Sequence, residues 1–325
     1  MTVTRAVAIG CGHYLPERIV ENAEFEKSLD TSDEWIRSRS GIERRHFAAE
    51  GQLTSDLALE AAKMALDDAG LQASDLDAIV LATATPDQTF PSTASKLQAA
   101  LGMTNGFAFD IQAVCAGFIY AISTANALIV SGQANRVMVV GAETFSRIMD
   151  WQDRSTCVLF GDGAGALILE AQTGSGASTD RGILSTDLHS DGRYNDLLYV
   201  DGGVSSTQTS GVLRMQGQEV FKHAVSKLAK TGETALEKAG ASVDDLTWIV
   251  PHQANLRIIK RTVAKMGLSM DRVIVTVQDH GNTSAASIPL ALSVAKIAGK
   301  FKRDDLLLME AIGGGLAWGA ATLRW

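Results

Sequence analysis

Cys115 is the residue of this 325-residue chain that is best placed to act as a nucleophile. It lies between residues 107–111, an apolar stretch typical of a strand, and residues 118–130, a stretch typical of a helix. A thiol at the start of a helix lies at the positive end of the helix dipole, so we expect a lowered pKa and more thiolate. A buried structural cysteine is the alternative, because free cysteines are among the most buried residues.

His252 and Asn282 are the side chains that we expect to assist this thiol. His252 directly follows the apolar residues 248–250, and open α/β sheets place their sites at the C-terminal ends of strands. Asn282 lies near the start of a predicted helix, where an amide either caps the helix or donates hydrogen bonds without titrating. A core histidine and a plain helix cap are the alternatives for these two residues.

An internal repeat indicates how the three residues meet. Residues 65–80 and 235–250 are identical at eight of sixteen positions, at a constant offset of 170 residues. Each copy reads as a helix that ends at a glycine, an acidic loop and an apolar strand. At the same offset Asn282 corresponds to Gln112, close to Cys115. We therefore expect the two turns to face each other across a pseudo-twofold axis, with His252 at a neighbouring strand end.

The order of the predicted elements defines the fold class. Apolar strands, among them residues 273–275, alternate with amphipathic helices, which indicates an α/β protein. A stretch of small and polar residues, 173–180, separates the two copies, so we divide the chain into halves 1–173 and 174–325. The glycine runs at 161–165 and 313–319 precede strands rather than helices, which excludes a dinucleotide-binding fingerprint.

The composition excludes several classes of function. With 37 acidic and 29 basic residues the formal net charge is −8, so general binding to nucleic acid or to an anionic membrane is not expected. The three cysteines are too few for a disulfide framework and lack the spacing of metal ligands. Neither a signal peptide nor an uncharged apolar run of membrane-spanning length is present. We expect a reduced, cytoplasmic protein without a bound metal.

Six segments in the same order resemble one family over essentially the whole chain. The sequence resembles β-ketoacyl-acyl carrier protein synthase III, the condensing enzyme that starts bacterial fatty acid synthesis. The segments that carry the resemblance are residues 31–36, 110–117, 160–165, 250–255, 280–287 and 313–319. The resemblance implies a thiolase-like fold, with two βαβαβαββ halves in a five-layered αβαβα core, and a homodimer that needs no cofactor.

The resemblance also implies a reaction in two stages. Cys115 attacks the thioester of a short acyl-CoA primer, and the backbone N–H groups of Cys115 and Gly314 hold the resulting oxyanion. Malonyl-acyl carrier protein then loses CO₂, and His252 and Asn282 hold the oxygen of its enolate. The enolate carbon attacks the acyl group on the sulfur, so that the products are a β-ketoacyl-acyl carrier protein, CoA and CO₂.

Residues outside this triad are implied to bind the two substrates. Thr31, Trp35, Arg39 and Arg154 match the site for the CoA nucleotide, where an indole and a guanidinium can sandwich adenine, and Asn255 matches a contact to pantetheine. Phe90 matches a residue that closes the acyl pocket of the partner subunit, which favours a short primer such as acetyl.

A basic surface is implied for the acidic acyl carrier protein. Its residues are Lys222, Arg257, Lys260, Arg261 and Lys265. Because positions 257, 261 and 265 recur every four residues, they share one face of a helix. An ordinary solvated helix face is the alternative interpretation.

Other functions on the same fold are less compatible with the sequence. Thiolases use a second cysteine near the C-terminal glycine run, which is absent here, and synthases that elongate longer chains use two histidines. A CoA-dependent acyltransferase, a ketosynthase of a specialised polyketide pathway and a non-catalytic dimer that binds acyl-CoA remain open. The identity of the primer is not determined by the sequence.

Overall fold

The computed structural model describes residues 2–325, which form two main sheets. The first sheet has the strand order β1 (Val3–Tyr14), β7 (Asp162–Gly174), β6 (Arg136–Thr144), β4 (Ala78–Ala82) and β5 (Phe107–Ile111). β4 is parallel to β5 and β6, whereas β7 is antiparallel to β1 and β6. Every residue of β4 is buried, as expected for an apolar strand that has helices on both faces.

The second sheet has the order β11 (Trp248–Pro251), β12 (Leu306–Gly313), β13 (Ala317–Arg324) and β8 (Gly182–Ser190). The predicted strand at 273–275 is wrong, because only Val273 forms an isolated bridge, to Ile249. The backbone of this segment forms hydrogen bonds with the side-chain amide of Gln253 instead. It donates to the carbonyl of Ile274 at 3.0 Å and accepts from the N–H of Thr276 at 2.8 Å.

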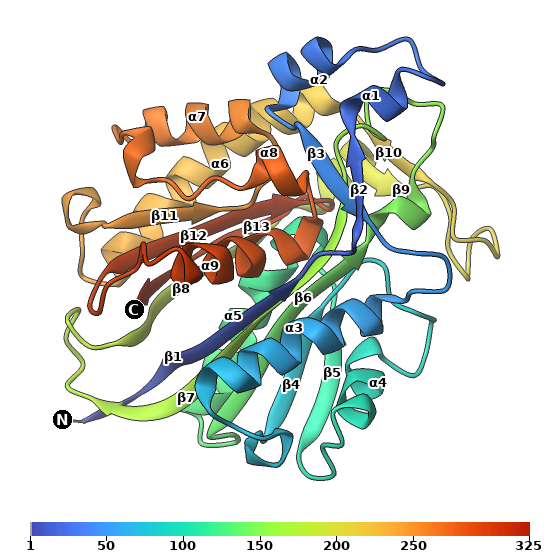
Figure 1. Ribbon diagram of the computed structural model, residues 1–325. Helices are drawn as coiled ribbons and strands as arrows, with labels where there is room; N and C mark the ends of the chain where they lie inside the picture. The colour runs from blue at the N-terminus through green and yellow to red at the C-terminus, as the bar shows by residue number, and fades with distance from the viewer. Residues whose placement is uncertain (1) are drawn as a thin grey trace.

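Helices form the layers outside and between these sheets (Figure 1). α3 (Thr54–Ala69) and α4 (Thr93–Ala100) pack on the outer face of the first sheet. α6 (Gly217–Lys238) and α7 (Leu256–Lys265) cover the outer face of the second sheet. α5 (Gly117–Val130) and α9 (Ser287–Ile297) lie in the central core that both sheets share. The result is the sequence helix, sheet, helix, sheet, helix.

Shorter elements cover the end of the molecule where Cys115 follows β5 and His252 follows β11. They are β2 (Arg18–Glu21), α1 (Asn22–Phe25), α2 (Asp33–Ser40), β3 (Arg44–Phe47), β9 (Leu198–Val200), β10 (Leu213–Met215) and α8 (Val277–His280). Further 3-10 turns are η1 (Ala73–Asp75), η3 (Phe145–Ile148), η4 (Gly192–Leu197), η5 (Val243–Asp245) and η6 (Met270–Arg272). In Figure 1, α1, α2, β9 and β10 lie together at this end.

The segments that repeat in the sequence adopt the same local structure. A glycine with positive φ follows the helix in both copies: Gly70 comes directly after α3, and Gly240 comes after Ala239, the C-cap of α6, with φ of +66° and +68°. A 3-10 turn and a buried strand follow in each copy. The predicted division between residues 173 and 174 falls at the end of β7, and the assignment of two halves at that point stays a prediction.

Residues 2–325 contain neither a membrane-spanning helix nor a cluster of metal-binding side chains. None of the helices there combines the length and apolar character that crossing a bilayer requires. No group of three or more His, Cys, Asp and Glu side chains within the same residues is arranged to hold a metal ion.

Candidate active site

Cys115 lies in the turn η2 (Val114–Ala116), which connects β5 to α5. The residue is only 4% exposed, because Gly313 of β12 packs directly against its backbone. A Cβ atom at position 313 would lie 2.6 Å from the Cys115 nitrogen, so only glycine fits there. Burial raises the pKa of the Cys115 thiol to about 12. The expected lowering of this pKa by the helix dipole is therefore wrong, because desolvation outweighs the dipole.

Asn282 lies beside a second turn, η7 (Ser284–Ala286), which packs directly against η2. Its side-chain oxygen accepts the N–H of Ser284 at 2.9 Å, so its NH₂ group remains available as a donor. Its backbone is held on both sides, since its N–H donates to Leu159 and its carbonyl accepts from Gly161. The orientation of the amide is thus fixed by the protein.

His252 lies at the C-terminal end of β11, where the sequence predicts it. Its Nδ1 is 2.6 Å from Ser287 Oγ, at the start of α9. Burial lowers the pKa of His252 to about 3, so the ring is neutral near pH 7. Because Ser287 Oγ already accepts the N–H of Gln253 at 3.2 Å, its own hydrogen is free to donate to Nδ1. This assignment leaves a hydrogen on Nε2, which can donate to a substrate.

Ser284 and Ser287 are the residues that hold the three candidates together. Ser284 lies beside the Cys115 thiol and donates its N–H to Asn282, while Ser287 contacts His252. Sequence reasoning missed both serines, although they belong to the segment 280–287 that carries the resemblance. The signal that was available is their position on one helical turn directly after Asn282.

Glu143 is a third residue that sequence reasoning missed. It is completely buried near the end of β6, and its partners are the hydroxyls of Thr83 and Thr85 and the N–H of Ala84. Burial raises its pKa to about 7. An acidic residue that continues the apolar run 137–142 was the available signal, since charged residues are almost never fully buried without a reason.

The glycine run after β12 has the close packing that a backbone donor site needs. Gly314 directly follows Gly313, which touches the Cys115 turn. A Cβ atom on Gly314 would lie 2.6 Å from the carbonyl oxygen of Leu198, so this position also requires glycine. A role of its N–H in binding an oxyanion stays a prediction.

The predicted CoA residues are gathered at the end of the molecule formed by α2. The guanidinium carbons of Arg39 and Arg154 lie 5.7 and 5.3 Å from the ring centroid of Trp35. Arg154 donates to both the carbonyl and the carboxylate of Asp30, which precedes Thr31. The Oγ1 atom of Thr31 is buried without a hydrogen-bond partner among residues 2–325. An indole flanked by two guanidinium groups is a suitable surface for a purine ring.

Asn255 links this clamp to the basic helix. Its side-chain oxygen accepts the N–H of Arg257 and so caps α7, and its NH₂ group donates to the carbonyl of Arg39 at 3.1 Å. Both ends of the amide are thus engaged within the protein. The predicted contact of Asn255 with pantetheine stays a prediction.

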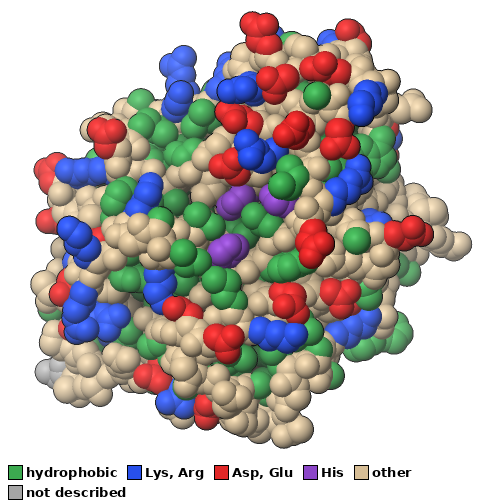
Figure 2. All heavy atoms as spheres, in the orientation of Figure 1, with side chains coloured by type: hydrophobic (Ala, Val, Ile, Leu, Met, Phe, Trp, Pro, Cys, Tyr) green, Lys and Arg blue, Asp and Glu red, His purple; other side chains and the backbone are tan. Residues whose placement is uncertain are grey.

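The predicted basic face on α7 is exposed. Arg257, Lys260, Arg261 and Lys265 are all exposed, and none of them forms an ion pair within residues 2–325. Arg257 lies over the ring of Phe221 on α6, at 5.8 Å. On α6, Lys222 is paired with Glu219 at 2.6 Å. The face drawn in Figure 2, by contrast, mixes acidic and basic side chains over most of its area.

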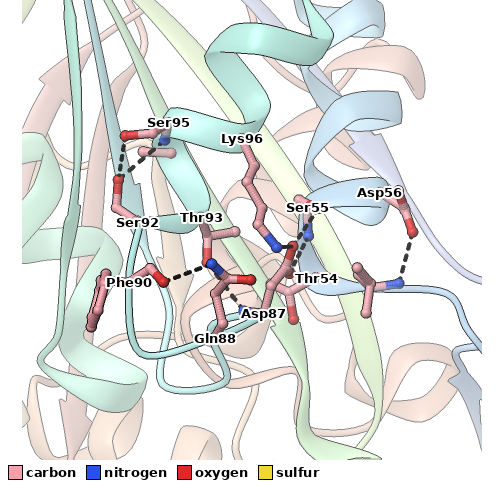
Figure 3. A network of polar contacts seen from close by, with 12 residues as sticks. Thr54, Ser55, Asp56, Asp87, Gln88, Phe90, Ser92, Thr93, Ser95 and Lys96 are labelled. Carbon is pink, nitrogen blue, oxygen red and sulfur yellow. Dashed lines mark hydrogen bonds and ion pairs between the residues drawn. The ribbon is translucent and has the colours of Figure 1, made fainter.

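Phe90 is 81% exposed on a loop that polar contacts hold in place. Asp87 anchors this loop, because it accepts the hydroxyl of Ser55 at 2.6 Å and pairs with Lys96 at 3.3 Å. Gln88 donates to the Phe90 carbonyl at 2.6 Å. Figure 3 shows the phenyl ring directed away from the cluster around Asp87. An apolar ring on an anchored loop is suited to contact another protein surface.

A cavity of about 1300 Å³ lies beside this loop. Its lining includes Thr85 and Gln88 from the loop, Val114 next to Cys115, and the apolar residues Phe145 and Leu198. An apolar space that reaches the neighbour of the thiol is a suitable place for an acyl group.

The paired sheets and the shared central helices define a thiolase-like fold, the fold of condensing enzymes that transfer acyl groups. The family described as "3-Oxoacyl-[acyl-carrier-protein (ACP)] synthase III" matches residues 109–192, and its C-terminal counterpart matches residues 236–325. The chain belongs to this 3-oxoacyl-[acyl-carrier-protein] synthase III family.

Known relatives cover the whole chain. It is 74% identical to the β-ketoacyl-[acyl-carrier-protein] synthase III of Ruegeria sp. (strain TM1040) over 99% of both chains. The 3-oxoacyl-[acyl-carrier-protein] synthase III structure from Aquifex aeolicus VF5 matches at a TM-score of 0.92 and 46% identity, over 98% of this chain and 100% of that one. The structure of the priming β-ketosynthase from the R1128 polyketide biosynthetic pathway matches at a TM-score of 0.91 and 34% identity, over 99% of this chain and 96% of that one. The predicted fold, family and acyltransferase class are confirmed.

Proposed function

We propose that this condensing enzyme uses Cys115, His252 and Asn282 to join a short acyl-CoA primer, acetyl-CoA in the first place, to malonyl-acyl carrier protein. The observation that carries this assignment is the contact between the turns η2 and η7, which puts Ser284 beside the thiol, while the N–H of Ser284 donates to Asn282. His252 joins the same group through Ser287. A thiol, a neutral imidazole and an oriented amide are the groups that the two half-reactions need.

In the first half-reaction the Cys115 sulfur attacks the carbonyl carbon of the primer thioester. The carbonyl oxygen becomes an oxyanion, and the backbone N–H groups of Cys115 and Gly314 are the proposed donors to it. When the carbonyl reforms, the bond to the CoA sulfur breaks and the acyl group stays on Cys115. Burial suits this acyl-enzyme, because a site without water protects a thioester from hydrolysis.

In the second half-reaction malonyl-acyl carrier protein loses CO₂ and forms an enolate. Nε2–H of His252 and the NH₂ group of Asn282 are the proposed donors to the enolate oxygen. Both donors are neutral, and desolvation favours this state of His252 by lowering its pKa to about 3. The enolate carbon then attacks the acyl carbon, and the Cys115 sulfur leaves. Both carbons of the new bond come from the substrates, so we propose that no cofactor takes part.

Two surfaces are proposed to receive the substrates. The clamp of Trp35, Arg39 and Arg154, with Thr31 beside it, is suited to the adenine and phosphates of CoA, and Asn255 lies between this clamp and α7. The basic face of α7 with Lys222 is suited to the acidic acyl carrier protein, whose approach it would accelerate. Both entrances would then lie at the same end of the molecule.

A homodimer is the proposed assembly, supported by β5 at the edge of the first sheet. Each of its residues is at least partly exposed, and Phe107 and Phe109 stack on its surface at 6.3 Å. An apolar edge strand of this kind needs a partner, and a second copy of the strand provides one. Phe90 would then reach the acyl pocket of the other subunit and restrict it to short primers. We also propose a cytoplasmic location, in agreement with three free, buried cysteines.

A role in a specialised polyketide pathway is the second candidate, favoured by the likeness to the R1128 priming β-ketosynthase. Mass spectrometry after incubation with acetyl-CoA tests the assignment. We expect acetylation of Cys115 and, after addition of malonyl-acyl carrier protein, release of CO₂ and a β-ketoacyl product. Acetylation without CO₂ release would indicate a plain acyltransferase, and no acetylation would reject Cys115 as the nucleophile. A competition among acetyl-, propionyl- and branched acyl-CoA identifies the primer.

A further inference from the structure

The thiol of Cys115 has to lose its proton before or during attack, and the site offers few acceptors for it. Burial disfavours a free thiolate, so the proton has to leave while the new bond to sulfur forms. His252 is not available in the tautomer assigned above. Its Nδ1 is occupied by Ser287 Oγ, and its Nε2 carries the hydrogen needed for the enolate. Another group must therefore receive the thiol proton.

Ser284 is the polar side chain that lies between the thiol and a carboxylate. Its hydroxyl is close enough to interact with both the Cys115 thiol and the Glu143 carboxyl. The same Oγ atom is buried and makes no well-aligned hydrogen bond among residues 2–325. Ser284 has a φ of +49°, an uncommon value for a residue with a side chain. The residue with this uncommon conformation is thus the one whose hydroxyl lies beside the nucleophile.

Glu143 has the surroundings of a proton acceptor rather than of an ion pair. Within residues 2–325, its hydrogen-bond partners are the hydroxyls of Thr83 and Thr85 and the N–H of Ala84, none of which carries a charge. The titratable group that faces it is the Cys115 thiol, which its negative charge disfavours as thiolate. Moving a proton from the thiol to Glu143 removes the repulsion between the carboxylate and the developing negative charge on sulfur while the sulfur attacks the substrate.

We propose that Ser284 and Glu143 form the path by which the Cys115 thiol loses its proton during acylation. Ser284 Oγ accepts the thiol proton and passes its own hydrogen to a Glu143 carboxylate oxygen, while the sulfur attacks the thioester carbonyl. When the bond between carbon and the CoA sulfur breaks, the CoA thiolate takes the proton back along the same path. The net change is a thioester exchange, and Ser284 and Glu143 return to their starting forms. Ser284 touches the reacting sulfur, and Glu143 acts through it.

This inference rests on the proposed role of Cys115 as the nucleophile. The experiment measures the rate of Cys115 acetylation by rapid quench and mass spectrometry between about pH 5 and pH 9, an interval of about two units on each side of neutrality suited to a carboxyl with a raised pKa. The variants are Ser284→Ala, Glu143→Gln and the double variant. Asp162→Asn is the matched control, because Asp162 is also a buried carboxylate that binds a serine hydroxyl and a backbone N–H.

For the wild type we expect the rate to rise with pH through about 7, as Glu143 loses its own proton. Glu143→Gln and Ser284→Ala should each slow acetylation at neutral pH by about 100-fold, the lower range for acid–base catalysis. Both should lack the rise near pH 7, and the double variant should be no slower than either single one. Asp162→Asn should keep the wild-type profile, and CO₂ release from malonyl-acyl carrier protein should change much less than acetylation.

Three results would overturn the proposal. The first is an unchanged pH profile in both single variants. The second is a loss that multiplies in the double variant or affects both half-reactions equally. The third is loss of the rise near pH 7 in His252→Ala with retention in Glu143→Gln, which would assign the proton to His252. A wild type that is not acetylated on Cys115 would refute the proposed nucleophile instead.

Discussion

Val114 and Ser284 lie 170 residues apart and share one uncommon backbone conformation, with φ of +48° and +49°. Each occupies the first position of a 3-10 turn that leads directly into a central helix, α5 or α9. Strained residues of this kind persist where the surrounding structure holds them, and they are concentrated at functional sites. The pair shows that the repeat extends to the backbone at the point where Cys115 and Asn282 are presented.

Asn282→Ala should affect the two half-reactions differently. Loss of one donor to an oxyanion costs about 2.7–4 kcal/mol in other acyl-transfer sites, so decarboxylation should slow by roughly 100- to 1000-fold. Acetylation of Cys115 should change by less than about 10-fold on the same scale, because its oxyanion is held by backbone donors. Measuring CO₂ release and acetylation separately checks this. Equal losses in both reactions would reject the assignment.

Ser287→Ala should disturb His252 without touching the thiol. The imidazole loses the partner of Nδ1, so its tautomer is no longer fixed, and CO₂ release should fall by about 10-fold or more. Ser293→Ala is a matched control, because Ser293 lies on the same helix and is also buried. Its Oγ atom lies 2.8 Å from Nδ1 of another histidine, His13. Both variants should lose about 1–3 kcal/mol of stability, but only Ser287→Ala should lose activity. A similar loss of activity in both would indicate a purely structural effect.

Trp35→Ala should weaken binding of the CoA primer. A cation–π contact is worth about 0.5–2 kcal/mol, so KM for acetyl-CoA should rise by about 2- to 30-fold, while KM for malonyl-acyl carrier protein stays unchanged. Trp248→Ala is the control, because this indole also has a cation, Lys300, at 5.8 Å but lies away from α2. An unchanged KM for acetyl-CoA would remove Trp35 from the proposed clamp.

Arg257→Glu should act on the other substrate. Reversal of one exposed charge on the basic face should raise KM for malonyl-acyl carrier protein by about 10-fold at low salt, and the effect should shrink as ionic strength increases. Kinetics with acetyl-CoA should stay nearly intact. Lys63→Glu on α3 provides an exposed lysine of the first half as control. Equal damage to both substrates would reject the basic face as the docking surface.

Because the Glu310 carboxyl is buried, we expect the stability of the protein to depend on pH, separately from any effect on catalysis. Burial raises its pKa from the ordinary 4.5 to about 8, and its Oε2 has no hydrogen-bond partner among residues 2–325. The folded state therefore binds this proton more tightly than the unfolded state does. The stability linked to Glu310 is fully present below about pH 4.5 and is lost as pH rises towards about 8.

Glu310→Gln removes that titration and leaves a neutral side chain of the same shape. Urea denaturation at pH 5 should give nearly the same free energy of unfolding for variant and wild type. At pH 8 the variant should be more stable, by at most about 5 kcal/mol for a shift of this size. Parallel curves for the two proteins would show that the carboxyl is not destabilised by burial.

The elements around Cys115 were predictable because local patterns determine them. The apolar residues 107–111 form β5, and the helix expected at 118–130 is α5, which begins one residue earlier. The repeat predicted that the turns of Cys115 and Asn282 meet, and the packing of η2 against η7 places them together. The apolar pattern predicted a strand at 273–275 that does not form. The backbone there forms hydrogen bonds with the Gln253 side chain, and an apolar run contains no signal for such a contact.

The electrostatics of the site were not predictable in the same way. The helix dipole at Cys115 follows from local order, but its burial depends on Gly313, which lies 198 residues further along the chain. The partners of Glu143 likewise come from residues 83–85, about sixty positions earlier. A pKa is determined by what surrounds a group in space, so its sign at Cys115 required the tertiary structure.

The matched backbones at Val114 and Ser284 have a consequence for how such a site can arise. Two identical subunits that met at these turns would have to present the same side chain from both, so a thiol would always face a thiol. In a single polypeptide each position can change alone. One turn therefore keeps sulfur, while the other provides a hydroxyl and, beside it, an amide. Joining the two units in one chain is what allows opposite sides of one chamber to perform different steps.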